Sequence, residues 1–458
     1  MTDPLDTPLA EQALALRQGA LTAPALMQAA LDRIAARDPG IGAVAYLDAG
    51  GAMQAAEAAQ AALDAGEAVG PLHGLPLGVK DIVDVAGQPG TFGSASVDPV
   101  PAARDAEAVA RLRAAGAIPL AKLVTYEFAL TGPAWDQPHP PARNPWNGAH
   151  ITGGSSSGSA AAVAGGLLRG AVGTDTGGSI RSPAAYCGVT GLKPTRGLVP
   201  AEGAFPLSPH LDCVGPLAAT PAEAALLLEV MAGRPVTERL GQDPTGLRIG
   251  YARGWLEDAA AHPALLPALD DAVGLLSRLG MPVVLADLPP YAPYEEAASV
   301  ILQAEALEVH APRLAQHYDR YGRDARANLI SGALLTPEDL AAARQVAKGL
   351  TAAMDAALAP FDVLICATTL GPALPFSAFE GGAVWTPMRT FPFNLTGHPA
   401  ISVPCGLAEG LPLGLQIIGR PGEEARLCQI AQAFFEASLP LAPPLPPMPP
   451  RGQDSGAP

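Results

Sequence analysis

Two loops rich in glycine and serine flank one short apolar segment near the middle of the chain. They occupy residues 153–159 and 173–181, with alanine, valine, glycine and leucine between them. Glycine lets backbone N–H groups turn inward together because no β-carbon stands in the way, and such a nest can hold an oxyanion. The second loop also carries Asp175 and Arg181, a charged pair that a flexible linker would not need. The two loops therefore predict a structured anion-binding site and not a flexible linker.

A lysine stands in an apolar environment upstream of these loops. Residues 75–85 alternate apolar and small side chains around Lys80, which predicts a strand buried on both faces. Burial of a lysine is costly unless the amine is paired or deprotonated. A desolvated Lys80 would have a lowered pKa and could act as a neutral base. Pairing with Asp81, or reaching out to the surface, is the structural alternative.

Helical and strand-like segments alternate along the rest of the chain, as expected of an α/β protein. Helices are expected at residues 9–17, 23–36, 52–65, 104–115, 160–168, 221–231, 262–279 and 423–435, and through most of 293–358. Strands are expected at residues 41–47, 118–124, 246–251, 282–286 and 362–367. The second helix should end at Asp38-Pro39-Gly40, because proline and glycine interrupt helices.

The serine loops, continuing through Gly191-Leu192-Lys193-Pro194-Thr195, resemble the amidase signature family. Residues 71–81 resemble that family's lysine strand, and residues 394–404 and 411–416 resemble its closing strands. The resemblance implies the amidase-signature fold, an α/β fold with a large mixed twisted β-sheet surrounded by α-helices.

The same resemblance implies a single catalytic domain over residues 1–438. Within it we expect a family core at about 60–220 and a variable helical insertion at about 290–360, where part of the substrate choice would reside. The proline-rich tail, residues 439–458, is expected to be extended and then disordered.

Roles for individual residues also follow from the resemblance. It implies that Ser179 is the nucleophile, that Ser155 is a bridging serine with a cis peptide bond, and that Lys80 is the base. The implied oxyanion donors are the backbone N–H groups of Thr176, Gly177, Gly178 and Ser179. Ser156, Asp175 and Arg181 would hold both loops in place. Tyr126, Phe128 and Trp135 are candidates for a substrate pocket, with packing in the core as the equal alternative.

The implied reaction is hydrolysis of the C–N bond of amides through a serine acyl-enzyme, which could extend to esters and carbamates (urethanes). The alternative within the family is the glutaminase subunit of a tRNA-dependent amidotransferase, which passes ammonia to a partner protein. A short G-x-S-x-G pattern at 154–158, with Asp362 and His398 downstream, also gives the chain order of an α/β-hydrolase triad. Residues 144–154 are expected to form a loop, however, and not the strand that such a triad requires.

Composition and charge limit which binding partners and which cellular compartment we expect for this protein. A formal net charge of −16 disfavours nucleic acid and anionic membrane surfaces. The five cysteines have no paired spacing for zinc or a disulfide framework, and no nucleotide-binding motif is present. The N-terminus lacks the features of a signal peptide, and no apolar run is long enough to span a membrane. We therefore expect a cytoplasmic monomer or homodimer that needs no cofactor or metal and acts on a small molecule.

Overall fold

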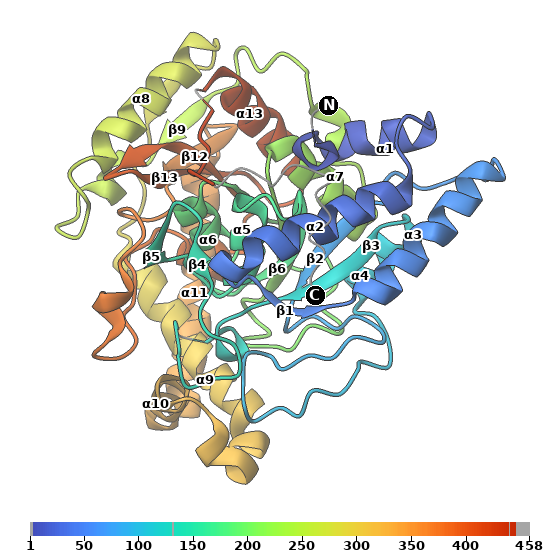
Figure 1. Cartoon of the computed structure of the whole chain (residues 1–458). Coiled ribbons are helices and arrows are strands. Elements are labelled where there is room, and N and C mark those ends of the chain that lie inside the picture. The colour runs from blue at the N-terminus through green and yellow to red at the C-terminus, as the bar shows by residue number, and fades with distance from the viewer. Residues whose placement is uncertain (1–2, 131, 439, 446–458) are drawn as a thin grey trace.

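Eleven strands form one mixed sheet through the middle of the molecule, and helices surround it (Figure 1). The computed structural model describes residues 3–130, 132–438 and 440–445. The strand order is β1-β3-β2-β6-β8-β7-β12-β13-β11-β9-β10. Strands β3, β2 and β6 are parallel to one another, as are β11, β9 and β10, while the strands between these groups pair antiparallel. The expected large mixed sheet is confirmed.

The strands of this sheet, together with one separate hairpin, have the following bounds. They are β1 Val44–Leu47, β2 Pro76–Lys80, β3 Ile118–Leu123, β4 Arg143–Asn144, β5 Asn147–Ile151, β6 Gly170–Asp175, β7 Thr190–Lys193, β8 Cys213–Ala218, β9 Ile249–Tyr251, β10 Val283–Leu285, β11 Val363–Ala367, β12 Ala400–Ala408 and β13 Leu411–Ile418.

The helices that surround the sheet follow most of the expected segments. They are α1 Leu9–Arg17, α2 Ala23–Ile41, α3 Ala49–Asp64, α4 Glu107–Ala114, α5 Ser157–Ala164, α6 Arg181–Cys187, α7 Pro221–Ala232, α8 Leu265–Arg278, α9 Ala292–His317, α10 Arg323–Ser331, α11 Pro337–Leu358, α12 Phe391–Leu395 and α13 Glu424–Ala437.

The second helix is longer than its sequence suggests. Helix α2 continues through Pro39 and ends at Ile41, followed by Gly42 in the left-handed conformation at φ 69°. Asp38 holds this last turn, because its carbonyl accepts from the Gly42 N–H at 2.6 Å and its Oδ1 accepts from the Ala43 N–H at 2.7 Å. The expected stop at Asp38-Pro39-Gly40 is therefore wrong.

Residues 144–154 are not the simple loop that the sequence suggests. Strands β4 and β5 pair there as a two-stranded hairpin outside the main sheet. The side chain of Asn144 fastens this hairpin to α6 by donating to the carbonyls of Ile151 and Tyr186 at 3.0 and 2.9 Å. Because the hairpin lies outside the main sheet, it does not provide the central strand that a nucleophile elbow needs.

The helices α9, α10 and α11 lie in the region expected to be a helical insertion, around residues 290–360. Helices α9 and α10 lie together at one end of the molecule, at the bottom of Figure 1. The mostly helical character of residues 293–358 is confirmed. In the described part of the chain, no helix is long and apolar enough to cross a membrane. Most of the predicted disordered tail, residue 439 and residues 446–458, lies outside the described residues.

Candidate active site

Two parallel strands bring the lysine and the second serine loop together. Strands β2 and β6 are neighbours, with Val79 opposite Val172, so their carboxyl ends lie at the same edge of the sheet. Strand β2 ends at Lys80, and β6 ends at Asp175, directly before the loop that carries Ser179. The sequence positions of these residues are far apart, but the sheet register makes them neighbours.

The Lys80 amine is fully buried and lies between two hydroxyl groups. Its Nζ is 2.7 Å from the Oγ of Ser155 and 2.8 Å from the Oγ1 of Thr174. Burial lowers the pKa of Lys80 to about 7, although Asp175 and Asp212 act to raise it. An amine with this pKa is substantially neutral at physiological pH and can accept a proton. The alternative pairing of Lys80 with Asp81 does not occur, because Asp81 lies 3.4 Å from the Nζ of Lys122 instead.

The first serine loop is held by hydrogen bonds to its backbone. The Gly154–Ser155 peptide bond is cis, as expected. The carbonyl of Ser155 accepts from the Tyr126 N–H at 3.2 Å and from the Thr125 hydroxyl at 3.1 Å. Its neighbour Ser156 connects both loops, because its N–H donates to the Ser179 carbonyl and its Oγ donates to the Thr174 carbonyl, each at 3.1 Å.

A buried ion pair fixes the second loop. The Oδ1 of Asp175 lies 2.8 Å from the Nη2 of Arg181, and both side chains are fully buried. Burial acts to raise the pKa of Asp175, but the charge and hydrogen bonds of Arg181 outweigh it and hold that pKa well below its usual range. Asn394 and Gln416 complete the network by bonding Arg181 at 2.6 and 2.7 Å. Sequence reasoning assigns these two residues no role, although both stand in the segments that resemble the closing strands.

The backbone of the second loop presents fewer free donors than expected. The Gly178 N–H donates to the Oδ1 of Asp175 at 2.8 Å, so the structure contradicts its expected role as an oxyanion donor. The N–H groups of Thr176, Gly177 and Ser179 have no hydrogen-bond partner among the described residues. A β-carbon at Gly177 would lie 2.7 Å from the ring of Phe391, so a side chain there would displace the wall of the site.

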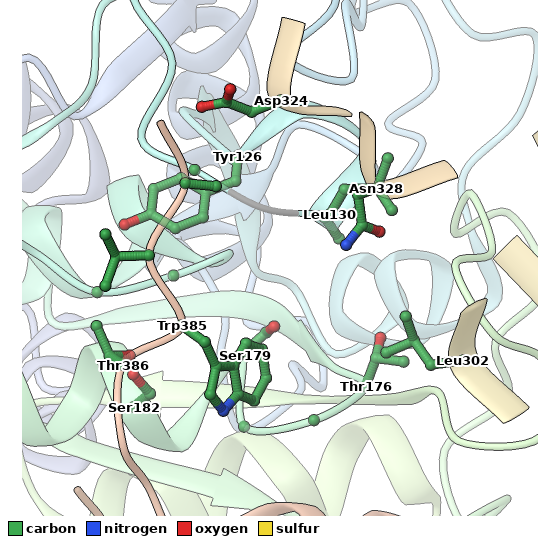
Figure 2. Close-up of a pocket in the computed structure, with 18 of the residues that line it drawn as sticks. Tyr126, Leu130, Thr176, Ser179, Ser182, Leu302, Asp324, Asn328, Trp385 and Thr386 are labelled. Atoms are coloured by element: carbon green, nitrogen blue, oxygen red, sulfur yellow. The ribbon is translucent and has the colours of Figure 1, made fainter. Parts of the chain in front are cut away.

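Ser179 lies at the surface of a cavity of about 650 Å³ (Figure 2). Tyr126, Thr176 and Ser182 line it near the serine loops, and α9, α10 and the segment 379–391 supply much of the remaining wall. In Figure 2, Leu302 projects from α9 and Asn328 from α10 toward the cavity. Two helices of the 290–360 region therefore line the space beside Ser179.

Of the three predicted pocket residues, only Tyr126 lines this cavity. Phe128 is fully buried in an aromatic cluster, with ring centroids 5.1 Å from Phe205 and 4.6 Å from His310. Its φ of 50° is left-handed, and its side chain does not line the cavity. Packing in the core was the alternative for Phe128, and it is the one the structure shows.

Trp135 is also outside the cavity lining. Its ring packs edge-on against Phe376 at 5.6 Å, and the residue is 55% exposed. Trp146, on the hairpin of β4 and β5, donates its indole N–H to the Cys187 carbonyl at 2.8 Å. Neither tryptophan lines the cavity, so the structure contradicts the expected pocket role of Trp135.

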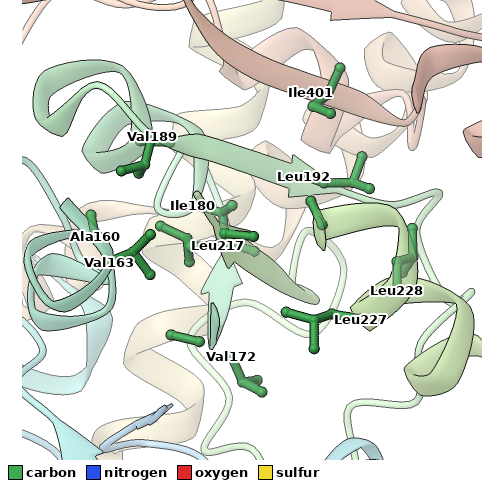
Figure 3. Packing of buried hydrophobic residues seen from close by; sticks show 14 of the residues in the cluster. Ala160, Val163, Val172, Ile180, Val189, Leu192, Leu217, Leu227, Leu228 and Ile401 are labelled. Atoms are coloured by element: carbon green, nitrogen blue, oxygen red, sulfur yellow. The ribbon is translucent and has the colours of Figure 1, made fainter. Parts of the chain in front are cut away.

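Close packing behind the loops explains why their sequence is so poor in large side chains. Figure 3 shows Ala160 and Val163 of α5 and Leu217 of β8 near Ile180, while Val172 of β6 lies on the side of Leu227. A β-carbon at Gly173 would lie 2.6 Å from Leu217 and 2.9 Å from the Ser156 Oγ. Small residues therefore let helix α5 and strand β6 approach closely enough to fix the two loops.

Asp212 is a functional candidate that the sequence did not reveal. Its carboxylate accepts from the Thr176 hydroxyl at 2.6 Å and from the N–H groups of Leu207 and Ser208. Burial raises the pKa of Asp212 to about 6, and its charge acts to raise the pKa of Lys80. It therefore couples the second serine loop to the lysine electrostatically.

The alternative hydrolase triad is not assembled. The Nδ1 of His398 is 2.8 Å from the Thr396 hydroxyl, and its Nε2 lies 3.1 Å from Asp355. Asp362 pairs with Arg426. Ser156, the central serine of the pattern, donates to the Thr174 carbonyl. Within the described residues, no group of three or more histidine, cysteine or acidic side chains could hold a metal ion.

Comparisons with known proteins identify the family of this chain. The family model described as Amidase matches residues 25–428. A glutamyl-tRNA(Gln) amidotransferase subunit from Roseiflexus sp. (strain RS-1) is 36% identical over 459 residues, covering 92% of this chain and 94% of that protein.

Solved structures give the same result for the fold. A crystal structure of an amidase matches with a TM-score of 0.87 at 34% identity, covering 94% of this chain and 99% of that one. The peptide amidase from Stenotrophomonas maltophilia matches with a TM-score of 0.86 at 31% identity, covering 96% and 98%. Sequence, fold and relatives thus agree that the chain belongs to the amidase signature family.

Proposed function

We propose that this protein is a serine amidohydrolase that cleaves the C–N bond of small carboxamides. The observation that carries the proposal is the contact between the buried Lys80 amine and Ser155, 2.7 Å apart, beside the cavity that Ser179 lines. Nucleophilic hydrolysis needs a serine, a nearby base and donors for the oxyanion. Ser179 at the cavity surface, the lowered pKa of Lys80 and the N–H groups of the second loop that have no partner among the described residues support these roles.

The proposed reaction begins with attack by the Ser179 Oγ on the amide carbonyl. The Ser179 proton passes to Ser155, which gives its own proton to the neutral Lys80 amine. Backbone N–H groups of Thr176, Gly177 and Ser179 stabilise the oxyanion, because they have no other partner among the described residues. Protonation by the reverse path releases the amine, and water then hydrolyses the acyl-enzyme.

The acyl-enzyme route extends to other activated carbonyl compounds. A serine nucleophile attacks esters and carbamates by the same steps, since only the leaving group differs. We therefore include aryl esters and aryl carbamates among the proposed substrates.

A second candidate function is that of a glutaminase subunit in a tRNA-dependent amidotransferase. It is supported by the relatives that are named as subunits of glutamyl-tRNA(Gln) amidotransferase, of which the Roseiflexus protein is one. In that case the enzyme would release ammonia from glutamine to a partner protein. The two candidates share the Ser179 chemistry and differ in substrate and partner.

Release of the leaving group from a panel of substrates separates the candidates. The panel contains aliphatic amides, anilides, aryl esters, aryl carbamates and glutamine, with Ser179→Ala as the blank. The proposal predicts cleavage of anilides or aliphatic amides by the isolated protein and its loss in the variant. Cleavage of glutamine alone would favour the second candidate, and activity that survives in Ser179→Ala would contradict both.

A further inference from the structure

The charged side chains in the described lining of the cavity are all negative. Among the described lining residues, Glu295 and Asp324 are the two with acidic side chains, and no lysine, arginine or histidine lines the cavity. The other walls are apolar or uncharged, and include Leu302 and Phe391. A ligand that enters this space meets two carboxylates, of which Asp324 is paired with the neighbouring Arg323.

Glu295 is connected to the second serine loop through aromatic rings. Its Oε1 accepts from the indole N–H of Trp385 at 2.9 Å, and the Trp385 ring lies 5.2 Å from the ring of Phe391. Phe391 in turn packs against Gly177, where an added β-carbon would lie 2.7 Å from its ring. Helix α9 thus positions this carboxylate at the wall of the same cavity that Ser179 lines.

Asp324 contributes from the first turn of helix α10, and Figure 2 shows it in the cavity view together with Tyr126. Its Oδ1 accepts from the Nε of Arg323 at 2.8 Å. The Arg323 side chain is 64% exposed, so its charge is well screened by water. Asp324 is therefore partly compensated, and Glu295 is the stronger of the two carboxylates as a recognition group.

The nearby buried arginines are committed to other partners. The guanidinium of Arg389 stacks on Tyr291 at 4.2 Å from the ring centroid and pairs with Asp258 at 2.5 Å. Arg181 is enclosed in the network of Asp175. Neither side chain lines the cavity, so neither can bind a substrate carboxylate there without rearrangement.

We propose that the cavity selects amides whose acyl chain ends in an ammonium group, with Glu295 as the main discriminating residue and Asp324 in support, and that it rejects amides ending in a carboxylate. This inference rests on the proposed hydrolase function and names its substrate class. The ammonium would pair with the Glu295 carboxylate, while the apolar walls would contact the intervening methylenes. A carboxylate at the same place would face like charge and lose its hydration without gaining a donor.

Binding of an ammonium group would stabilise the charged form of Glu295. Burial raises the pKa of the Glu295 carboxyl, although the Trp385 hydrogen bond and the charge of Arg389 act to lower it. A bound ammonium adds a favourable charge next to a carboxylate that burial disfavours. An anionic ligand would have the opposite effect.

Three 4-nitroanilides of similar chain length test the proposal: 6-aminohexanoyl, heptanoyl and adipoyl, which end in an ammonium, a methyl and a carboxylate group. For the unmodified enzyme we expect kcat/KM to fall in that order, with roughly tenfold between successive substrates, which corresponds to about 1.4 kcal/mol per step. Glu295→Gln keeps a side-chain oxygen for Trp385 but removes the charge. It should reduce the ratio of ammonium to methyl substrate about tenfold, and Asp324→Asn should reduce it less.

Glu296→Gln is the matched control, because Glu296 is exposed, adjacent in sequence and outside the cavity lining. It should leave the ratio unchanged. Equal kcat/KM for the three anilides, or an equal effect of Glu296→Gln and Glu295→Gln, would overturn the inference while leaving the hydrolase function intact. Failure to cleave any of the three anilides or the aliphatic amides of the panel, with Ser179→Ala indistinguishable from the unmodified enzyme, would overturn the proposed function and this inference together.

Discussion

The Nζ of Lys80 lies 2.7 Å from the Oγ of Ser155, although the two residues are 75 positions apart in the chain. Strand β2 ends at Lys80, and the hydrogen bonds of Thr125, Tyr126 and Ser156 hold the Ser155 loop against it. A lysine in this environment is uncharged often enough to accept a proton. The contact therefore gives Ser155 a neighbouring amine that can accept a proton, which a charged surface lysine could not do.

Removal of this amine should greatly reduce activity without unfolding the protein. We expect Lys80→Met to lower kcat/KM for a cleaved anilide by about 10² to 10⁴-fold, the usual contribution of a general base. Lys348→Met is the matched control, since Lys348 is exposed on α11 and should behave like the unmodified enzyme. Steady-state kinetics and far-ultraviolet circular dichroism provide the measurements. Comparable loss in both variants would contradict the role of Lys80.

The pH dependence of kcat/KM should reflect the protonation of Lys80. Because Lys80 must be neutral to accept a proton and its pKa is lowered to about 7, kcat/KM should rise with pH through a limb near 7. Asp212 acts to raise that pKa, so Asp212→Asn should move the limb to lower pH. Glu67→Gln, a change of the same charge at an exposed position, should leave it in place. A limb that stays fixed in Asp212→Asn would exclude this coupling.

The buried ion pair should dominate the stability of the second loop. Asp175→Asn leaves the Arg181 guanidinium buried without its charge partner, and we expect it to lower the free energy of unfolding by about 3–5 kcal/mol. Asp98→Asn, which removes an exposed carboxylate from Arg320, should have little effect. Denaturant titration measures both. Similar midpoints for the two variants would show that Asp175 does not hold the loop.

Phe128 should matter for stability and not for specificity. Phe128→Leu removes ring contacts with Phe205, His310 and Tyr321, and we expect it to lower the free energy of unfolding by about 1–3 kcal/mol. The rank order of substrates in the panel should not change, because Phe128 does not line the cavity. An altered rank order would return Phe128 to the substrate pocket.

Much of the fold is open to prediction from local pattern. The alternation around Lys80 predicts a buried strand, and β2 is one, although it stops at the lysine itself. Strand β6 escapes such prediction because Gly170 and Gly173 weaken the strand signal. These glycines are required by packing against Leu227 and Leu217, which belong to other elements, so only the tertiary structure explains them.

Several contacts in the candidate site cannot be predicted from local sequence patterns. The serine loops and Lys80 are identifiable from their motifs, yet a motif cannot show that the Gly178 N–H is taken by Asp175. Nor can it show that Phe128 packs against Phe205 and His310, which come from distant parts of the chain. Asp212 carries no motif at all, and it becomes a candidate only when the fold places it beside Thr176.

The central claim is that Ser179 forms a covalent acyl-enzyme. Rapid mixing with an excess of a 4-nitrophenyl ester, followed by mass analysis of proteolytic peptides, tests it most directly. We predict a burst of about one equivalent of 4-nitrophenol per active site, an acyl group on the peptide that contains Ser179, and neither result in Ser179→Ala. An acyl group on Ser155 instead, or an undiminished burst from Ser179→Ala, would contradict the account.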